Sequence, residues 1–423
     1  MGDPTFARAN GRSDVAPCPS DNGRSMRAGF EEAPVHVRTF PARPPRATGE
    51  QRPLRIAIVA PPVLPLPPPM YAGTERIVAS LAQGLHDRGH HVTAFAAGDS
   101  DLPCEVVPVV PRSLWSEGMT GDLSLYHQMA VARAWDEVDR FDIVHSHVDT
   151  HGFQFAEHSR IPVVTTLHRR LDVGGAADYI DLLPGIPLVA ISDSQRRWNA
   201  DANWVATIHH GLDFSATPTG SRPGEYLLLV GRLTREKGVA EAIELATRTR
   251  RRLVIAAKAH QPGEKALFES VVQPAIDAGV VDWRGEVDGA TRDKLMVGAL
   301  ATVMLGAWPE PFGLVAIESM ATGTPVIGRR AGALTETIDH GMTGYLVDDV
   351  DEAVLAVGRV ASLARDRIAS STRERFSANR MIDAYEAVYR DLVMPHVVPD
   401  EPDPADHTVP RAGAAEDLVA TAG

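Results

Sequence analysis

The chain of 423 residues has little cysteine and no long apolar run, and each of these features excludes some classes of protein. Its two cysteines, Cys18 and Cys104, cannot build a disulfide framework, so we expect a reducing compartment, the cytoplasm. No apolar run approaches the roughly 18 to 20 residues that a membrane span requires. Arginines occur near the first residue without an apolar stretch behind them, so we also expect no secretory signal.

Acidic residues outnumber basic ones, 55 against 42, so the formal net charge is −13. Such an excess of acids argues against a general nucleic-acid binder. The chain also lacks G-x-x-x-x-G-K-[ST] and G-x-G-x-x-G, the usual marks of ATP hydrolysis and of dinucleotide binding. Any phosphate site must therefore be local, built from backbone N–H groups and a few placed cations.

Short apolar runs and segments of helical spacing alternate through most of the chain. Residues 1–52 and 395–423 lack any apolar period, and we expect both to be disordered tails. Between them, LRIAIVA (54–60) and HVTAFAA (91–97) have the composition of buried strands, and ERIVASLAQGLHDRG (75–89) has helical spacing. Strand, helix and strand in this order predict a βαβ unit with parallel strands.

The alternation occurs in two series, which predict two Rossmann-like domains at 53–210 and 211–376. The boundary is placed near 205–224, where Gly, Pro, Ser and Thr gather. A last helix at about 377–393 is expected to pack back on the first domain. Further strands are predicted at 141–147, 162–168, 188–192, 226–231, 253–257, 281–285, 301–305 and 324–328. The predicted fold class is α/β, with two doubly wound parallel sheets facing a cleft and ligands at the carboxyl ends of their strands.

The segment WPEPFGLVAIESMATGTPVI (308–327) carries the clearest chemical pattern. Two prolines prevent a helix around Glu310, so that carboxylate is expected on a loop. A helix can begin near Gly313 and stop at Gly323, and its first N–H groups favour an anion such as a diphosphate. Glu318 follows on the same helix, where its carboxylate could accept two hydrogen bonds from a vicinal diol. Two surface glutamates near a helix start are the plainer alternative.

The same segment resembles the signature of a known enzyme family. EPFGLVAIE (310–318) is similar to the Glu-(x)7-Glu signature of family 4 retaining glycosyltransferases of the YGGTE-type bacterial subgroup, which have the GT-B fold. Other segments resemble that family in the expected order, and the resemblance spans roughly 53–393. These segments are YAGTER (71–76), FDIVHSH (141–147), VGRLTREKG (230–238), WRGEV (283–287) and GALTETIDHGMTGYLV (332–347).

The resemblance implies an activity and its substrates. A retaining, hexosyltransferase-like enzyme would move a sugar from a nucleoside-diphosphate sugar, with UDP or GDP, to an acceptor hydroxyl. The acceptor, whether a small molecule, a glycan or a lipid-linked sugar, is left open. No cofactor and no metal are implied. Two D-x-D patterns of the kind that metal-dependent transferases use, at 99–101 and 349–351, are short enough to occur by chance.

The resemblance also implies roles for individual residues. Arg232 and Lys237 would hold the donor diphosphate, whereas Glu310 would contact hydroxyls of the donor sugar. Glu318 would bind the ribose, and His147 would lie beside the reacting centre. The remaining expected donor contacts are Gly73, Val287, Phe312, Gly313 and Leu314. Strand alternation places His145 and His147 on one face, with His147 nearer the carboxyl end of its strand.

Several positions leave alternatives open. His168 and Arg169 are expected to face the acceptor. Lys258 is either an extra cation over the site or a solvated side chain. Ala72 stands where the family has a glycine, which narrows the backbone options beside the donor. His210 likewise replaces the usual asparagine before a glycine.

Two further alternatives concern partners and reaction class. Arg250, Arg251 and Arg252 would either form a solvated helix end or give a weak peripheral contact with anionic lipid. With the same fold, the chain could instead be a nucleotide-sugar epimerase or a non-catalytic nucleotide-sugar binder. A sugar phosphorylase would need pyridoxal phosphate on a lysine, and no motif for it is recognisable.

Overall fold

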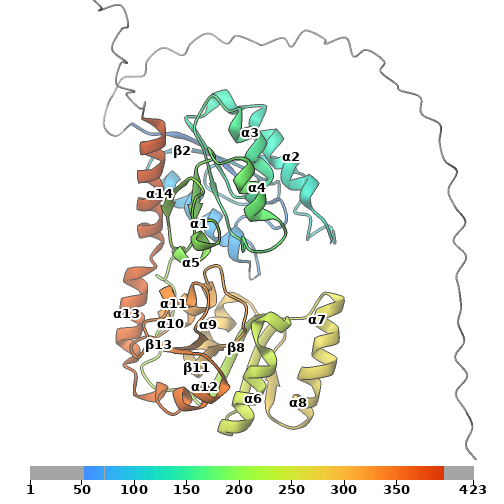
Figure 1. The fold of residues 1–423 in the computed structure, drawn as a ribbon, viewed down its shortest axis with the longest axis vertical. Helices are drawn as coiled ribbons and strands as arrows, with labels where there is room; N and C mark the ends of the chain where they lie inside the picture. The colour runs from blue at the N-terminus through green and yellow to red at the C-terminus, as the bar shows by residue number, and fades with distance from the viewer. Residues whose placement is uncertain (1–51, 71, 120, 395–423) are drawn as a thin grey trace, which may run out of the picture. The chain divides into compact units, whose positions relative to one another are not determined.

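The computed structural model describes residues 52–70, 72–119 and 121–394 (Figure 1). Both predicted tails lie outside these ranges, apart from Arg52. The described residues form a seven-stranded sheet with the order β3-β2-β1-β4-β5-β6-β7 and a six-stranded sheet with the order β10-β9-β8-β11-β12-β13. Every strand pair in both sheets is parallel. The predicted class, two doubly wound α/β sheets, is confirmed.

The first sheet and its helices occupy the first half of the described chain. Its strands are β1 (Arg55–Val59), β2 (His91–Ala97), β3 (Glu105–Val110), β4 (Ile143–Ser146), β5 (Val163–Thr166), β6 (Leu188–Ala190) and β7 (Trp204–Thr207). Its helices are α1 (Gly73–Asp87), α2 (Ser124–Trp135), α3 (Phe153–Glu157), α4 (Ala176–Leu182) and α5 (Asp193–Arg196).

The apolar run of β1 follows from burial on both faces of this sheet. Ile56 and Ile58 pack in one buried cluster with residues of α1, whereas Ala57 and Val59 pack in another with residues of α2. A strand covered on both sides has no polar face, so its sequence shows no alternation. This burial explains why a continuous apolar run predicted the strand.

The second sheet has the same construction. Its strands are β8 (Tyr226–Arg232), β9 (Leu253–Lys258), β10 (Val281–Trp283), β11 (Ala299–Met304), β12 (Val326–Arg329) and β13 (Gly344–Val347). Its helices are α6 (Val239–Thr249), α7 (Pro262–Leu267), α8 (Gln273–Asp277), α9 (Gly289–Gly298), α10 (Leu314–Ala321), α11 (Leu334–Thr337), α12 (Val350–Val357) and α13 (Arg365–Arg375).

Two segments connect the part that holds the first sheet with the part that holds the second. Leu212, between β7 and β8, exchanges backbone hydrogen bonds with Phe376 and Ala378, just before α14 (Ala378–Val393). That last helix lies beside α1 (Figure 1) and also contacts β4. The domain boundary at residues 210 and 211 stays a prediction.

None of the helices in the described ranges combines the length and apolarity needed to cross a bilayer.

Candidate active site

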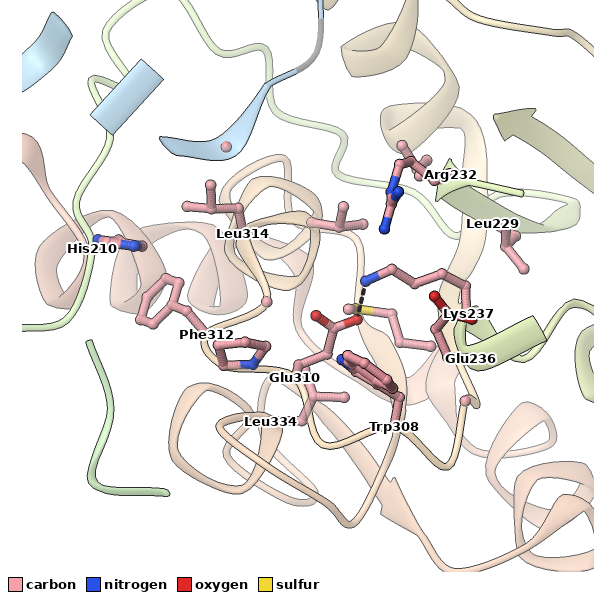
Figure 2. A pocket seen from close by; sticks show the side chains of 18 of the residues that line it. His210, Leu229, Arg232, Glu236, Lys237, Trp308, Glu310, Phe312, Leu314 and Leu334 are labelled. Carbon is pink, nitrogen blue, oxygen red and sulfur yellow. Dashed lines mark hydrogen bonds and ion pairs between the residues drawn. The ribbon is translucent and has the colours of Figure 1, made fainter. Parts of the chain in front are cut away.

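A cavity of about 300 Å³ lies where the carboxyl ends of strands from both sheets meet (Figure 2). From the first sheet, residues at the start of α1 and after β5 line it, and from the second sheet, residues after β8 and β11. Open α/β sheets bind ligands at this end of their strands. The predicted site residues that line this cavity are Gly73, His168, Arg232, Lys237, Lys258, Glu310, Phe312, Gly313 and Leu314.

Lys237 and Glu310 form an ion pair on the cavity wall (Figure 2). Their side chains are 29% and 14% exposed, so the pair can exchange partners with a ligand. Two glycines allow the segments that carry Lys237 and Glu310 to approach each other closely. A Cβ atom on Gly306 would lie 1.8 Å from the carbonyl oxygen of Glu236, and Gly238 has a φ of +73° that favours glycine.

Two more cations stand at the ends of neighbouring strands. Arg232 ends β8 and pairs in register with Lys258, which ends β9. Arg232 is exposed, and Figure 2 shows it above Lys237 on the same side of the cavity. Lys258 lies 3.9 Å from a carboxylate oxygen of Glu286. Lys258 lines the cavity, and the choice between its two alternatives stays a prediction.

The helix predicted to begin near Gly313 is α10, which starts at Leu314. Gly313 precedes it with a φ of +88°. Across the cavity, Ala72 precedes α1 with a φ of −149°, an extended conformation that alanine adopts without strain. The glycine missing at position 72 is therefore not needed for the backbone there.

Glu318 lies on α10, buried behind a second cavity of about 150 Å³. One of its oxygens, Oε1, accepts from Arg76 on α1 and from Nη1 of Arg292 on α9, the latter at 2.9 Å. The other oxygen, Oε2, is buried and has no hydrogen-bond partner in the described part of the chain. The second cavity is lined by both arginines and by Val287, an expected donor contact. Glu318 itself lines neither cavity, so a direct contact between its unpartnered oxygen and a ligand would need a rearrangement.

His147 follows β4 and is only 1% exposed. It shares a face with His145, as the alternation predicted, with ring centroids 3.9 Å apart. Neither cavity is lined by His147. Its Nδ1 lies 2.9 Å from Nε2 of His168, and His168 lines the larger cavity. A direct contact between His147 and a ligand would need a rearrangement, and its role beside the reacting centre stays a prediction.

Burial keeps these imidazoles neutral. It lowers the pKa of His168 to about 4 and the pKa of His147 well below its usual value. His210 stacks on His168 with ring centroids 5.3 Å apart, and its pKa is also lowered by burial. At neutral pH this part of the cavity therefore offers polar but uncharged groups.

Other predicted positions lie apart from the cavity. Arg169 is exposed, and its carbonyl oxygen accepts from Gln195. The D-x-D aspartates have local structural partners, since Asp99 accepts from Ser113 and Asp349 caps α12. Within residues 52–70, 72–119 and 121–394 no group of three or more His, Cys, Asp or Glu is arranged to hold a metal ion. Independence from metal stays a prediction.

The sequence assigned no role to several residues that line these cavities. Arg76 belongs to a segment that resembles the family and Trp308 lies two residues before another, whereas Arg292 lies in no motif. For His210 the sequence showed only that it replaces the asparagine that the family usually has before a glycine. The pairing of Arg76 and Arg292 with Glu318 joins residues from three different helices. No local pattern could have revealed it.

Comparison with known proteins defines the class. The family model described as Glycosyltransferase Family 4 matches residues 71–220, and the one described as Glycosyl transferases group 1 matches residues 219–381. The chain is a glycosyltransferase with the GT-B fold. The two matches support a place among GT-B enzymes of the family 4 type.

Particular relatives agree with that class. The chain is 26% identical to D-inositol 3-phosphate glycosyltransferase of Mycolicibacterium smegmatis, over 81% of this chain and 92% of the relative. It is 28% identical to glycogen synthase of Mycobacterium tuberculosis, over 76% and 89% of the two chains. Among solved structures, Anabaena HepE in complex with UDP-glucose superposes with a TM-score of 0.64 at 17% identity, over 80% and 100% of the two chains. The last likeness concerns the fold alone.

Proposed function

We propose that this glycosyltransferase moves a sugar from a nucleoside-diphosphate sugar to an acceptor hydroxyl with retention of anomeric configuration. The Lys237–Glu310 pair supports this proposal most directly, because it sets a cation and a carboxylate side by side on the cavity wall. The cation suits a diphosphate, and the carboxylate suits sugar hydroxyls. That Anabaena HepE has been solved with UDP-glucose supports the donor class.

In this proposal the cations assist departure of the nucleotide. As the bond from the anomeric carbon to the β-phosphate oxygen breaks, negative charge grows on that phosphate. Arg232, Lys237 and the first N–H groups of α10 stabilise the growing charge, and such stabilisation lowers the barrier. The acceptor oxygen bonds to the same face of the sugar, and its proton passes to the leaving phosphate. No metal is required in this scheme.

The test begins with a thermal-shift screen of UDP, GDP and their sugar conjugates, followed by transfer assays with the conjugate that stabilises the protein most. We expect one sugar conjugate to raise the melting temperature of the protein more than its free nucleotide does. During transfer from that conjugate, the purified protein should release the nucleotide both with and without EDTA. Turnover of the donor to an epimer without acceptor would make the chain an epimerase. Binding without any turnover, with candidate glycan, lipid-linked and small-molecule acceptors present, would make it a binder. Activity lost in EDTA and restored by Mn²⁺ would contradict metal independence.

A further inference from the structure

His147 and His168 share a hydrogen bond that the sequence resemblance does not predict. Nδ1 of His147 and Nε2 of His168 lie 2.9 Å apart, so one of these two nitrogens carries the shared proton. The other nitrogen of His147, Nε2, is buried and has no hydrogen-bond partner among the described residues. These two facts together decide where the protons lie.

Both imidazoles are neutral, so each carries one proton. If His168 donated to His147, the proton of His147 would sit on its unpartnered Nε2, as a buried donor without an acceptor. Orphaned buried N–H groups are rarer in proteins than under-satisfied acceptors. The proton of His147 therefore lies on Nδ1 and is donated to His168.

This arrangement leaves the proton of His168 on Nδ1. His168 is the histidine of the pair that lines the larger cavity, and Nε2 is already used by His147. Rings on two sides restrain it, since His147 lies 5.2 Å and the stacked His210 lies 5.3 Å from it between centroids. The imidazole is thus held in one orientation and one tautomer.

We propose that His168 donates a hydrogen bond from Nδ1 to a substrate oxygen in the cavity, and that His147 is a positioning residue that fixes this tautomer. The ligand atom is a hydroxyl or anionic oxygen, of the donor sugar or of the acceptor. His168 then acts as a donor that orients the substrate and removes no proton from it. The proposal rests on the proposed transfer reaction, but its structural half can be measured without knowing the substrate.

The first measurement is the tautomer of His168 by long-range ¹H–¹⁵N correlation on histidine-labelled protein at pH 7. Its signals are identified among those of the 16 histidines by their loss in His168→Phe. We expect Nδ1 to carry the proton. In His147→Phe the tautomers should mix, whereas His147→Asn should keep the wild-type tautomer, because the amide nitrogen of asparagine is also bonded to Cγ and can donate. A proton on Nε2 of wild-type His168, or equal behaviour of the two His147 variants, would overturn the proposal.

The second measurement locates the substrate oxygen. His168→Phe and His147→Phe should lower kcat/KM for transfer about tenfold, the effect of losing one hydrogen bond, and His147→Asn should restore most of it. Calorimetry with the free nucleotide and with its sugar conjugate separates the two sources. A selective loss of affinity for the conjugate assigns the oxygen to the donor sugar, and unchanged affinity for both assigns it to the acceptor. Wild-type kcat/KM in His168→Phe would refute the contact.

Discussion

The cations and carboxylates of the site differ in how firmly their partners hold them. Lys237 and Glu310 are both partly exposed, so water or a ligand can replace either partner at little cost. Glu318 is buried between two arginines, where breaking a pair leaves an uncompensated charge. Lys237 is therefore free to turn to a diphosphate, whereas Glu318 is held in place before any ligand arrives.

Replacing Lys237 tests the diphosphate site. Lys237→Ala should weaken binding of UDP or GDP, whichever wild type prefers, by about 10- to 100-fold, since a hydrogen bond to a charged group contributes about 1.5 to 3 kcal/mol. Isothermal titration calorimetry measures the effect. Arg235→Ala is the matched control, because Arg235 is an exposed cation in the same turn and does not line the cavity. Equal affinities of wild type and Lys237→Ala would place the diphosphate elsewhere.

Glu318 lines neither cavity, so a ribose must displace neighbouring groups to reach it. Its single unpartnered oxygen then predicts unequal roles for the two ribose hydroxyls. Because Oε1 already accepts from two arginines, only Oε2 can take a hydroxyl without displacing them. Removing one hydroxyl from the preferred nucleotide should weaken binding about tenfold, and removing the other should weaken it clearly less. Calorimetry with the 2′-deoxy and 3′-deoxy forms tests this, and Glu318→Ala should abolish the difference. Equal losses would indicate a forked contact instead.

At the scale of elements, α14 ties the end of the described chain to the first sheet. The hydroxyl of Tyr389 lies 2.6 Å from Nδ1 of His145 on β4, and both side chains are fully buried. Tyr385 on the same helix bonds Thr166 on β5 at 3.0 Å. These buried bonds fix the helix against the strands that carry His147 and His168, so the helix supports the site without lining it.

Removing one such bond should destabilise the protein without changing its fold. Tyr389→Phe leaves Nδ1 of His145 without its partner, at an expected cost of about 1 to 3 kcal/mol in free energy of unfolding. Urea denaturation measures it. Arg390→Ala on the same helix should change stability by no more than about 0.5 kcal/mol, since it removes a pair with Glu386 at i,i+4. Similar midpoints for Tyr389→Phe and wild type would show that the buried bond contributes nothing.

At the scale of the whole molecule, buried neutral histidines make stability depend on pH. Burial lowers the pKa of His127 to about 4, and also lowers the pKa values of His145, His147 and His210. In the unfolded chain each would take up a proton near pH 6.5. Between that pH and the folded pKa the unfolded state binds more protons, so stability is full above about pH 6.5 and falls as the pH drops toward 4.

His127 offers a clean test because it lies on α2, away from both cavities. Wild type should lose free energy of unfolding between pH 7 and pH 5. In His127→Phe that loss should be smaller by on the order of 1 kcal/mol, since one titrating group is gone. Urea midpoints at the two pH values give the comparison. His158→Phe, at an exposed position, should follow the wild-type profile, and an unchanged loss in His127→Phe would contradict the assignment.

The sequence by itself determined the central strands, the order of the elements and the loop position of Glu310. Burial on both faces gives central strands continuous apolar runs, and glycines and prolines mark the turns where side chains reach a ligand. The three strands that the sequence did not reveal, β3, β7 and β13, all lie at sheet edges. Edge strands have one neighbour and weaker burial, so their pattern is less distinct.

Tertiary structure alone decided which residues meet in the site. His147 follows the strand that the sequence predicted. In the folded chain it is buried and contacts His168, which lies 21 positions further along the chain. Arg76 binds Glu318, which lies 242 positions further along the chain, and leaves the other carboxylate oxygen of Glu318 without a partner among the described residues. Local patterns record the burial and turns of each segment. They carry no information on which segments pack together, because that depends on the whole chain.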